Sequence, residues 1–315
     1  MNDRRRWLLY GALVVGLAQL AWPPALHAVA AQRVVRLRNA FISAVKNRAA
    51  VEDDFRVDHV KPSINPVGSG GEDGDLHVSG RPGTLIALPM VAEVVNAKLE
   101  KDDVVQSLRD LEGTAQKVRI TGVWRLWFEH PPADVLVQGG TVPRPDGTNP
   151  DHIFELHPIV TVDGHAADES FVPISGYTAY TAQKAFGAYE KLEFRVKHGA
   201  SFTTVSSTKV GYNYTEFEAV LAGAPKHTND ATFVLADIVD EDGTSVVAKP
   251  RRLVIADDTK AAQAFHAKQP KKGTTLRVLG IPRVNLDKLM DEAENAAGDT
   301  VVVKGAYEII VVGIE

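Results

Sequence analysis

The sequence predicts a mainly β protein with a few helices (α+β), built as two tandem five-stranded β-barrels. Polar and apolar residues alternate in many segments with the two-residue period of half-buried strands, and few segments show helical spacing. The same order of strands and helices then recurs in the second half of the chain. The chain has no cysteine, so its stability must come from packed cores rather than from disulfides or thiolate metal sites.

The clearest strands lie on either side of a Pro- and Gly-rich connection in the first half, over residues 117–128 and 151–162. One face of the first strand is apolar and carries Val118, Ile120, Trp124, Leu126 and Phe128. The opposite face carries Arg119, Thr121, Arg125, Trp127 and Glu129. Earlier strands are expected over 57–65, 76–79 and 84–91, followed by a helix over 97–112. Five strands with a helix between the third and the fourth follow the plan of the OB-fold barrel.

The pattern begins again in the second half of the chain. Strands are expected over 213–221, 232–239, 252–256, 275–284 and 301–312, with helices over 257–267 and 286–296. The motif Arg-apolar-x-Gly-apolar-x-Arg occurs at 119–125 and again at 277–283, each time after a helix. Glu155-Leu156, in the first closing strand, has a counterpart in Glu308-Ile309. These matches indicate a tandem duplication and therefore a second OB-like barrel.

The chain is expected to divide into five segments, namely a signal peptide (1–30), a helical lead-in (31–56), a first OB-like domain (57–165), a connector (166–190) and a second OB-like domain (191–315). The lead-in prediction rests on apolar residues at helical spacing between residues 33 and 58, among them Val34, Leu37 and Phe41. Roughly 280 residues after the signal peptide are enough for two domains, each with its own core.

The first 30 residues have the pattern of an export signal. Arg4, Arg5 and Arg6 precede an apolar run from Trp7 to Trp22, and residues 28–30 form a small-residue cleavage site. We therefore expect a secreted or periplasmic protein, exported by the general or the twin-arginine route. The apolar run is shorter than the roughly 20 residues that a membrane span needs, so no span is expected after cleavage.

The charge balance bears on possible partners. The net charge is −5, and it becomes −7 without the first 30 residues, which contain three Arg and one Asp. Proteins that bind the phosphate backbone usually present a positive face, so nucleic acid is not an expected partner.

Three motifs in the first half also occur together elsewhere. They are Asp73-Gly-Asp-Leu-His77, Val118-x-Ile-Thr-Gly-Val123 and Glu155-Leu-His-Pro158. In this order they resemble a group of uncharacterised secreted bacterial proteins with an OB-like domain. The resemblance covers about residues 57–165 and implies the fold and export, but no established activity. The chain departs from the group in having no cysteine and a long 129–151 connection.

In an OB barrel, the loop after the first strand and the loop before the fifth strand lie beside the usual ligand face. Here they carry Asp73, Asp75, His77, Glu129, His130 and His152, together with Glu72 and Asp151. Carboxylates and imidazoles could bind zinc, or oxygens alone could bind calcium. The alternative is structural, because Asp73-Gly74 is an ordinary tight-turn pair and Asp75 could hydrogen-bond the turn. No short ligand motif such as His-Glu-x-x-His is present, so no cofactor is firmly expected.

Two further groups are candidates for chemistry. Glu155 and His157 share one face of a strand and are the candidate catalytic residues, although no nucleophile stands at a fixed spacing. Arg119 or Arg125 on the neighbouring strand could instead pair with Glu155 and fix the register. Trp127, with Arg125 and Arg119, could form a ligand-binding stacking surface if it is exposed. The alternative is that the 129–151 loop or the second domain covers Trp127.

The favoured function is that of an exported, non-catalytic binding protein with an unknown ligand or envelope partner. The alternative is a metal-dependent hydrolase, a nuclease-like OB barrel with the acidic and His residues as ligands and Arg81, Arg119 and Arg125 facing a phosphate. Convergence of the side chains with an open coordination position would favour the hydrolase. Dispersed side chains would favour the binding protein.

Overall fold

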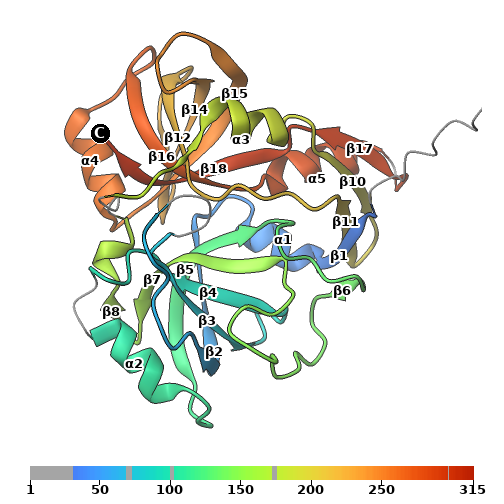
Figure 1. Cartoon of the computed structure of the whole chain (residues 1–315). Helices are drawn as coiled ribbons and strands as arrows, with labels where there is room; N and C mark the ends of the chain where they lie inside the picture. The colour runs from blue at the N-terminus through green and yellow to red at the C-terminus, as the bar shows by residue number, and fades with distance from the viewer. Residues whose placement is uncertain (1–30, 69–72, 100–102, 172–175, 297) are drawn as a thin grey trace, which may run out of the picture. The chain divides into compact units, whose positions relative to one another are not determined.

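The computed structural model describes residues 31–68, 73–99, 103–171, 176–296 and 298–315. The expected signal peptide and Glu72 lie outside these residues. The chain from Ala31 to Glu315 forms one compact unit, and two closed five-stranded barrels lie within it (Figure 1). No helix in the described part of the chain is both long and apolar enough to cross a bilayer.

The first barrel has the predicted plan. Its five strands and its helix are β2 (Ala50–Val60), β3 (Leu76–Pro82), β4 (Met90–Val94), α2 (Asp103–Leu111), β5 (Val118–Leu126) and β7 (Phe154–Val162). They pair in the order β4-β3-β2-β5-β7, and a parallel pairing of β4 with β7 closes the ring. The helix connects the third strand to the fourth, as in an OB-fold.

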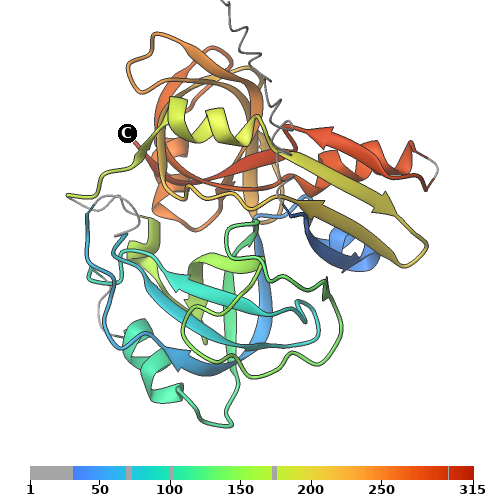
Figure 2. The ribbon, with the colours of Figure 1, turned by 45° about the vertical axis from the view of Figure 1, so that its right-hand side comes forward.

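The second barrel repeats this arrangement. Its elements are β12 (Thr215–Leu221), β14 (Ala231–Val239), β15 (Val246–Ala256), α4 (Lys260–Lys268), β16 (Thr275–Val284) and β18 (Tyr307–Ile314). Pairing of β12 with β14 closes the ring, and β15 runs parallel to β18 (Figure 2). The helix α4 begins where Thr259 accepts a hydrogen bond from the backbone N–H of Ala262. The predicted fold class, mainly β with two OB-like barrels, is confirmed.

A third sheet joins segments from both ends of the chain. Its order is β17 (Val301–Lys304), β10 (Glu193–His198), β11 (Phe202–Ser207), β1 (Arg33–Arg38) and β6 (Leu136–Val137). The short elements outside the barrels are α1 (Asn39–Val45), β8 (His165–Ala166), a 3-10 helix (Asp168–Phe171), β9 (Tyr180–Thr181), α3 (Ala182–Tyr189), β13 (Lys226–His227) and α5 (Leu286–Glu294). The helix α5 is the second helix predicted for this half.

The predicted helical lead-in is wrong. Residues 33–60 form a strand, a short helix and a second strand, and only α1, which is seven residues long, is helical. In β2 every second residue from Val51 to Val57 is buried, including Asp53 between its acidic neighbours. This two-residue period continues across the acidic run, and it outweighs the helical spacing of the few apolar residues before it.

The repeated motif has the same role in both barrels. A Cβ on Gly122 would lie 2.7 Å from the Cβ of Leu156, and one on Gly280 would lie 2.3 Å from a methyl carbon of Ile309. Each glycine therefore lets its strand approach the closing strand of its own barrel. The arginine that ends each motif pairs with the glutamate beside that contact, Arg125 with Glu155 and Arg283 with Glu308.

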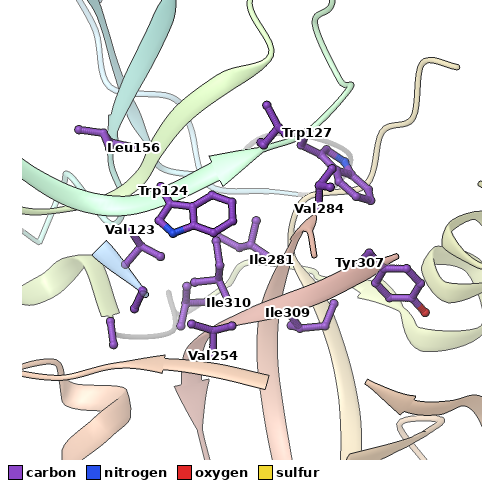
Figure 3. Close-up of a cluster of buried hydrophobic side chains, with 14 of the residues drawn as sticks. Val123, Trp124, Trp127, Leu156, Val254, Ile281, Val284, Tyr307, Ile309 and Ile310 are labelled. Atoms are coloured by element: carbon purple, nitrogen blue, oxygen red, sulfur yellow. The ribbon is translucent and has the colours of Figure 1, made fainter. Parts of the chain in front are cut away.

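The two arginines also tie the barrels to each other. Arg125 donates from Nε to the carbonyl of Pro282 at 2.9 Å, and Arg283 donates to the carbonyl of Trp124 at 3.0 Å. The guanidinium of Arg283 lies 3.6 Å from the centre of the Trp124 ring, whose indole faces Ile281 and Ile310 of the second barrel (Figure 3). The contact between β5 and β16 is thus reciprocal, with each arginine bonded to the residue that precedes the other.

Candidate functional site

The strands β3, β4 and β7 are adjacent in the first barrel (Figure 1). Polar side chains gather on their outer face. His77 pairs in register with Glu93, and the parallel register of β4 and β7 continues from Ala92–Leu156 to bring Glu93 beside His157. Asp75 immediately precedes β3. Because successive side chains on a strand alternate, the neighbours of these residues in sequence, such as Leu156, point into the barrel core.

Asp75, Glu93 and His157 converge in space. One ligand atom from each lies within 4.8 Å of the other two, and the residues are 0%, 5% and 0% exposed. Two ligands of one ion can lie no farther apart than twice the metal–ligand distance, about 4.0–5.2 Å for bonds of 2.0–2.6 Å. The three side chains therefore lie close enough together to hold a metal ion.

Two oxygens of this triad have no hydrogen-bond partner among the described residues, Oδ1 of Asp75 and Oε2 of Glu93. Oε2 of Glu93 lies 3.6 Å from Nδ1 of His157 and 3.6 Å from Nε2 of His77, beyond hydrogen-bond distance. Most buried polar atoms in proteins are hydrogen-bonded, so two bare carboxylate oxygens in one cluster call for a bound group or a proton.

Tyr214 covers the triad from the other half of the chain. Its hydroxyl donates to Oδ2 of Asp75 at 2.8 Å and lies 2.9 Å from Nε2 of His157. Tyr214 immediately precedes β12 of the second barrel, and its ring packs edge-on against Tyr177 with centroids 5.1 Å apart. The triad is thus enclosed by residues that follow the first barrel in sequence.

The electrostatics of the triad reflect its burial. Burial raises the pKa of Asp75 to about 6 and raises the pKa of Glu93 well above its usual range. Burial alone would lower the pKa of His157, but the carboxylates of Glu93 and Asp75 outweigh it and raise that pKa well above normal. A protonated His157 therefore balances part of the negative charge of the carboxylates.

A second polar group adjoins the triad through Glu155. Nη1 of Arg125 pairs with Glu155, and Nη2 donates to Glu129 at 3.0 Å and to Asn213 at 2.8 Å. His152 lies 3.1 Å from Glu155 through Nε2. Burial would raise the pKa of Glu155, but Arg125 outweighs it and holds that pKa well below its usual range. Glu155 is thus a fully partnered carboxylate.

The structure corrects the membership of the predicted metal cluster. Of the six candidates, Asp75 belongs to the triad, His77 reaches only its edge at Glu93, and Asp73 has a structural role because it accepts from Asn65 and from the backbone of Asp75. The other three candidates, Glu129, His130 and His152, lie with the Arg125–Glu155 pair, where the two histidine rings stack at 5.3 Å.

The predicted stacking surface is not formed. Trp127 and Arg125 are both 0% exposed, and Trp127 packs edge-on against Tyr189 of α3 at 5.4 Å. Arg119 is exposed, but it lies apart from them and faces Glu52 at 3.6 Å. Trp127 is covered, as the alternative expected, but the element that packs against it is α3 of the connector, which the alternative did not name. Of the two predicted pairings with Glu155, the one with Arg125 is correct.

Two members of the site were missed by the sequence reasoning. Glu93 is the one charged residue in the otherwise apolar strand 90–94, and a charge inside a buried strand was a usable signal. Tyr214 lies 139 positions from Asp75, and no local pattern connects them. His157 was singled out as a candidate catalytic residue, but its contacts with Asp75 and Glu93 place it in the triad.

No protein-family model matches this sequence, and no curated protein is significantly similar to it.

Proposed function

We propose that this chain is a non-catalytic, exported binding protein whose first barrel holds one divalent metal ion at Asp75, Glu93 and His157. The observation that carries the proposal is the pair of buried carboxylate oxygens in the triad that have no hydrogen-bond partner among the described residues. An unpartnered polar group costs about 1–3 kcal/mol on burial, and more when it is charged. A bound cation would satisfy both oxygens at once.

The donor set favours zinc. Zinc binds imidazole nitrogen at about 2.0–2.1 Å and carboxylate oxygen at about 2.0–2.2 Å, usually in four-coordinate sites. Calcium takes about six to eight oxygen ligands, and the triad offers one imidazole and two carboxylates. Because the nitrogen is a poor ligand for calcium and the oxygens are few, we favour zinc over calcium.

Enclosure favours binding over catalysis. Structural zinc sites are closed, whereas catalytic sites keep a position open to water or substrate. All three residues of the triad are at most 5% exposed, and the Tyr214 hydroxyl lies against two of them. The metal-dependent hydrolase is therefore the second candidate function. The convergence of the three side chains supports it, but their burial from substrate does not.

The pattern of residues 1–30 supports export of the protein. In such a protein the ion would hold β3, β4 and β7 together on the outer face of the barrel. That is the face through which OB-folds commonly bind their ligands.

The test is elemental analysis of the chain from Ala31 onward, purified without chelator and without metal-affinity resin. We expect about one zinc per chain, lost in Asp75→Asn and in Glu93→Gln. Glu129→Gln is the matched control, because Glu129 belongs to the neighbouring Arg125–Glu155 group and should keep the zinc. A metal-free wild-type chain that also fails to take up added zinc would refute the proposal. Metal-dependent cleavage of a phosphodiester, abolished in Glu93→Gln, would favour the hydrolase.

A further inference from the structure

Resting on the proposed metal site, we infer that Tyr214 is the fourth ligand of the ion, so that the site is completed by the part of the chain that forms the second barrel. The triad supplies three donors from the first barrel, and a four-coordinate zinc site needs one more. The hydroxyl of Tyr214 is in contact with two of the three ligand residues.

The Tyr214 hydroxyl needs little movement relative to Asp75 and His157. The hydroxyl oxygen lies 2.8 Å from Oδ2 of Asp75 and 2.9 Å from Nε2 of His157. Two ligands of a tetrahedral ion with bonds of 2.0–2.2 Å lie about 3.3–3.6 Å apart. Separating the hydroxyl from Nε2 by less than 1 Å therefore brings these two atoms to the spacing of coordinated atoms, and Asp75 can coordinate through Oδ1, its unpartnered oxygen.

The tyrosine is already held in place. Tyr214 is 3% exposed, and its ring packs edge-on against Tyr177 at 5.1 Å and against His157 at 5.7 Å. Its backbone carbonyl accepts from the N–H of Tyr180, at the start of the short pairing between β9 and β12. Ordering the side chain on binding would therefore cost little conformational entropy.

The other polar groups around the triad have partners of their own. Glu155 is occupied by Arg125 and His152, and Asp73 accepts from Asn65 and from the backbone. Nε2 of His77 lies 3.5 Å from the side-chain amide nitrogen of Asn65 and 3.6 Å from Glu93. Tyr214 donates its single hydroxyl hydrogen to Asp75. On coordination the oxygen binds the ion as a phenolate, and the hydrogen leaves as a proton to the solvent, as protons on metal ligands do.

Copper(II) is the probe, because a phenolate bound to copper(II) absorbs visible light by ligand-to-metal charge transfer. We expect this band when one copper is added to the metal-free wild-type chain, and no such band in Tyr214→Phe. Copper affinity should fall at least about tenfold in Tyr214→Phe. Tyr177→Phe is the matched control, because the ring of Tyr177 contacts Tyr214 and the substitution keeps that ring. The band should be unchanged in this variant. Circular dichroism establishes that both variants are folded.

The outcomes separate this inference from the proposed function. If the wild-type chain binds one copper without the band, and Tyr214→Phe binds it equally tightly, the metal site stands and Tyr214 is not a ligand. If the wild-type chain binds neither copper nor zinc, the proposed function fails and this inference with it. If the band is lost in Tyr177→Phe but kept in Tyr214→Phe, the fourth ligand is Tyr177, and the inference is overturned.

Discussion

Replacing Arg283 by Met should destabilise the protein far more than replacing Arg277, the other arginine of the same copy of the motif, by Met. Arg283 is completely buried and pairs with Glu308 through Nε at 2.6 Å. Its other nitrogens donate to the carbonyls of Ala49, Trp124 and Arg48 at 3.0–3.1 Å. Burial also lowers the pKa of Arg283 to about 10.

The expected loss of stability in Arg283→Met depends on which interactions the partners of Arg283 keep. Breaking a buried ion pair by removing one partner costs about 3–5 kcal/mol. Glu308 keeps its contact with Arg252, and the carbonyls of Ala49 and Arg48 each keep a second donor from Trp124. We therefore expect the lower end of this range, about 3 kcal/mol, for Arg283→Met.

Urea unfolding followed by tryptophan fluorescence measures this difference. Arg277→Met is the control, because Arg277 opens the same motif but is half exposed and pairs with Glu216 on the surface. Surface pairs contribute about 0–1 kcal/mol. If the free energies of unfolding of Arg283→Met and Arg277→Met differ by less than about 1 kcal/mol, then the reciprocal arginine contact does not hold the barrels together.

Two further predictions use residues matched in type but not in surroundings. Gly280→Ala should lower the free energy of unfolding by about 1–3 kcal/mol, because the added methyl would meet Ile309 at 2.3 Å. Gly187→Ala in α3, with open space around it, should raise the free energy of unfolding by about 0.5–1 kcal/mol. Equal unfolding temperatures for these two variants would contradict the packing argument. Trp124→Phe should cost about 0.5–1.5 kcal/mol more than Trp127→Phe, because the indole N–H of Trp124 donates to a backbone carbonyl at 2.8 Å and that of Trp127 has no hydrogen-bond partner among the described residues. Urea unfolding of both variants measures the difference, and a larger loss for Trp127→Phe would show that ring packing decides.

The fourth strand of each barrel was predictable because its alternation is strong and local, whereas the predictions of 57–65 and 84–91 misplaced the strands Ala50–Val60 and Met90–Val94. The prediction for 275–284 matches β16 at both ends, and the Arg-Gly-Arg motif with its paired glutamate located the fourth and fifth strands of each barrel. The third sheet was not predicted, because Thr203 and Ser207 are buried polar residues and leave β11 without an apolar face. Its register is set instead by pairing with the distant strand β1.

The site was only partly predictable, because it is made by tertiary contacts. The local motif around Asp75 and the Glu155-x-His157 spacing identified two of the residues that meet. Glu129 and His152 carry the same donor types, but Glu129 pairs with Arg125 and His152 with Glu155, in a separate group. Whether a carboxylate is paired with an arginine depends on where that arginine side chain lies in the folded protein. Sequence spacing does not specify this position.

The pairing of β1 with β11 also sets the order in which the chain can fold during synthesis. Arg33 pairs with Ser207, and Arg38 pairs with Phe202. The strand β1 therefore has no antiparallel partner until the ribosome has translated the first barrel, the connector and β11. At about 5–20 residues per second, the intervening stretch takes roughly 10–30 s to make. The first barrel can close during that interval, while the strand at its head waits for its partner. The pairing of β1 with β11 therefore cannot form before residue 207 has been made.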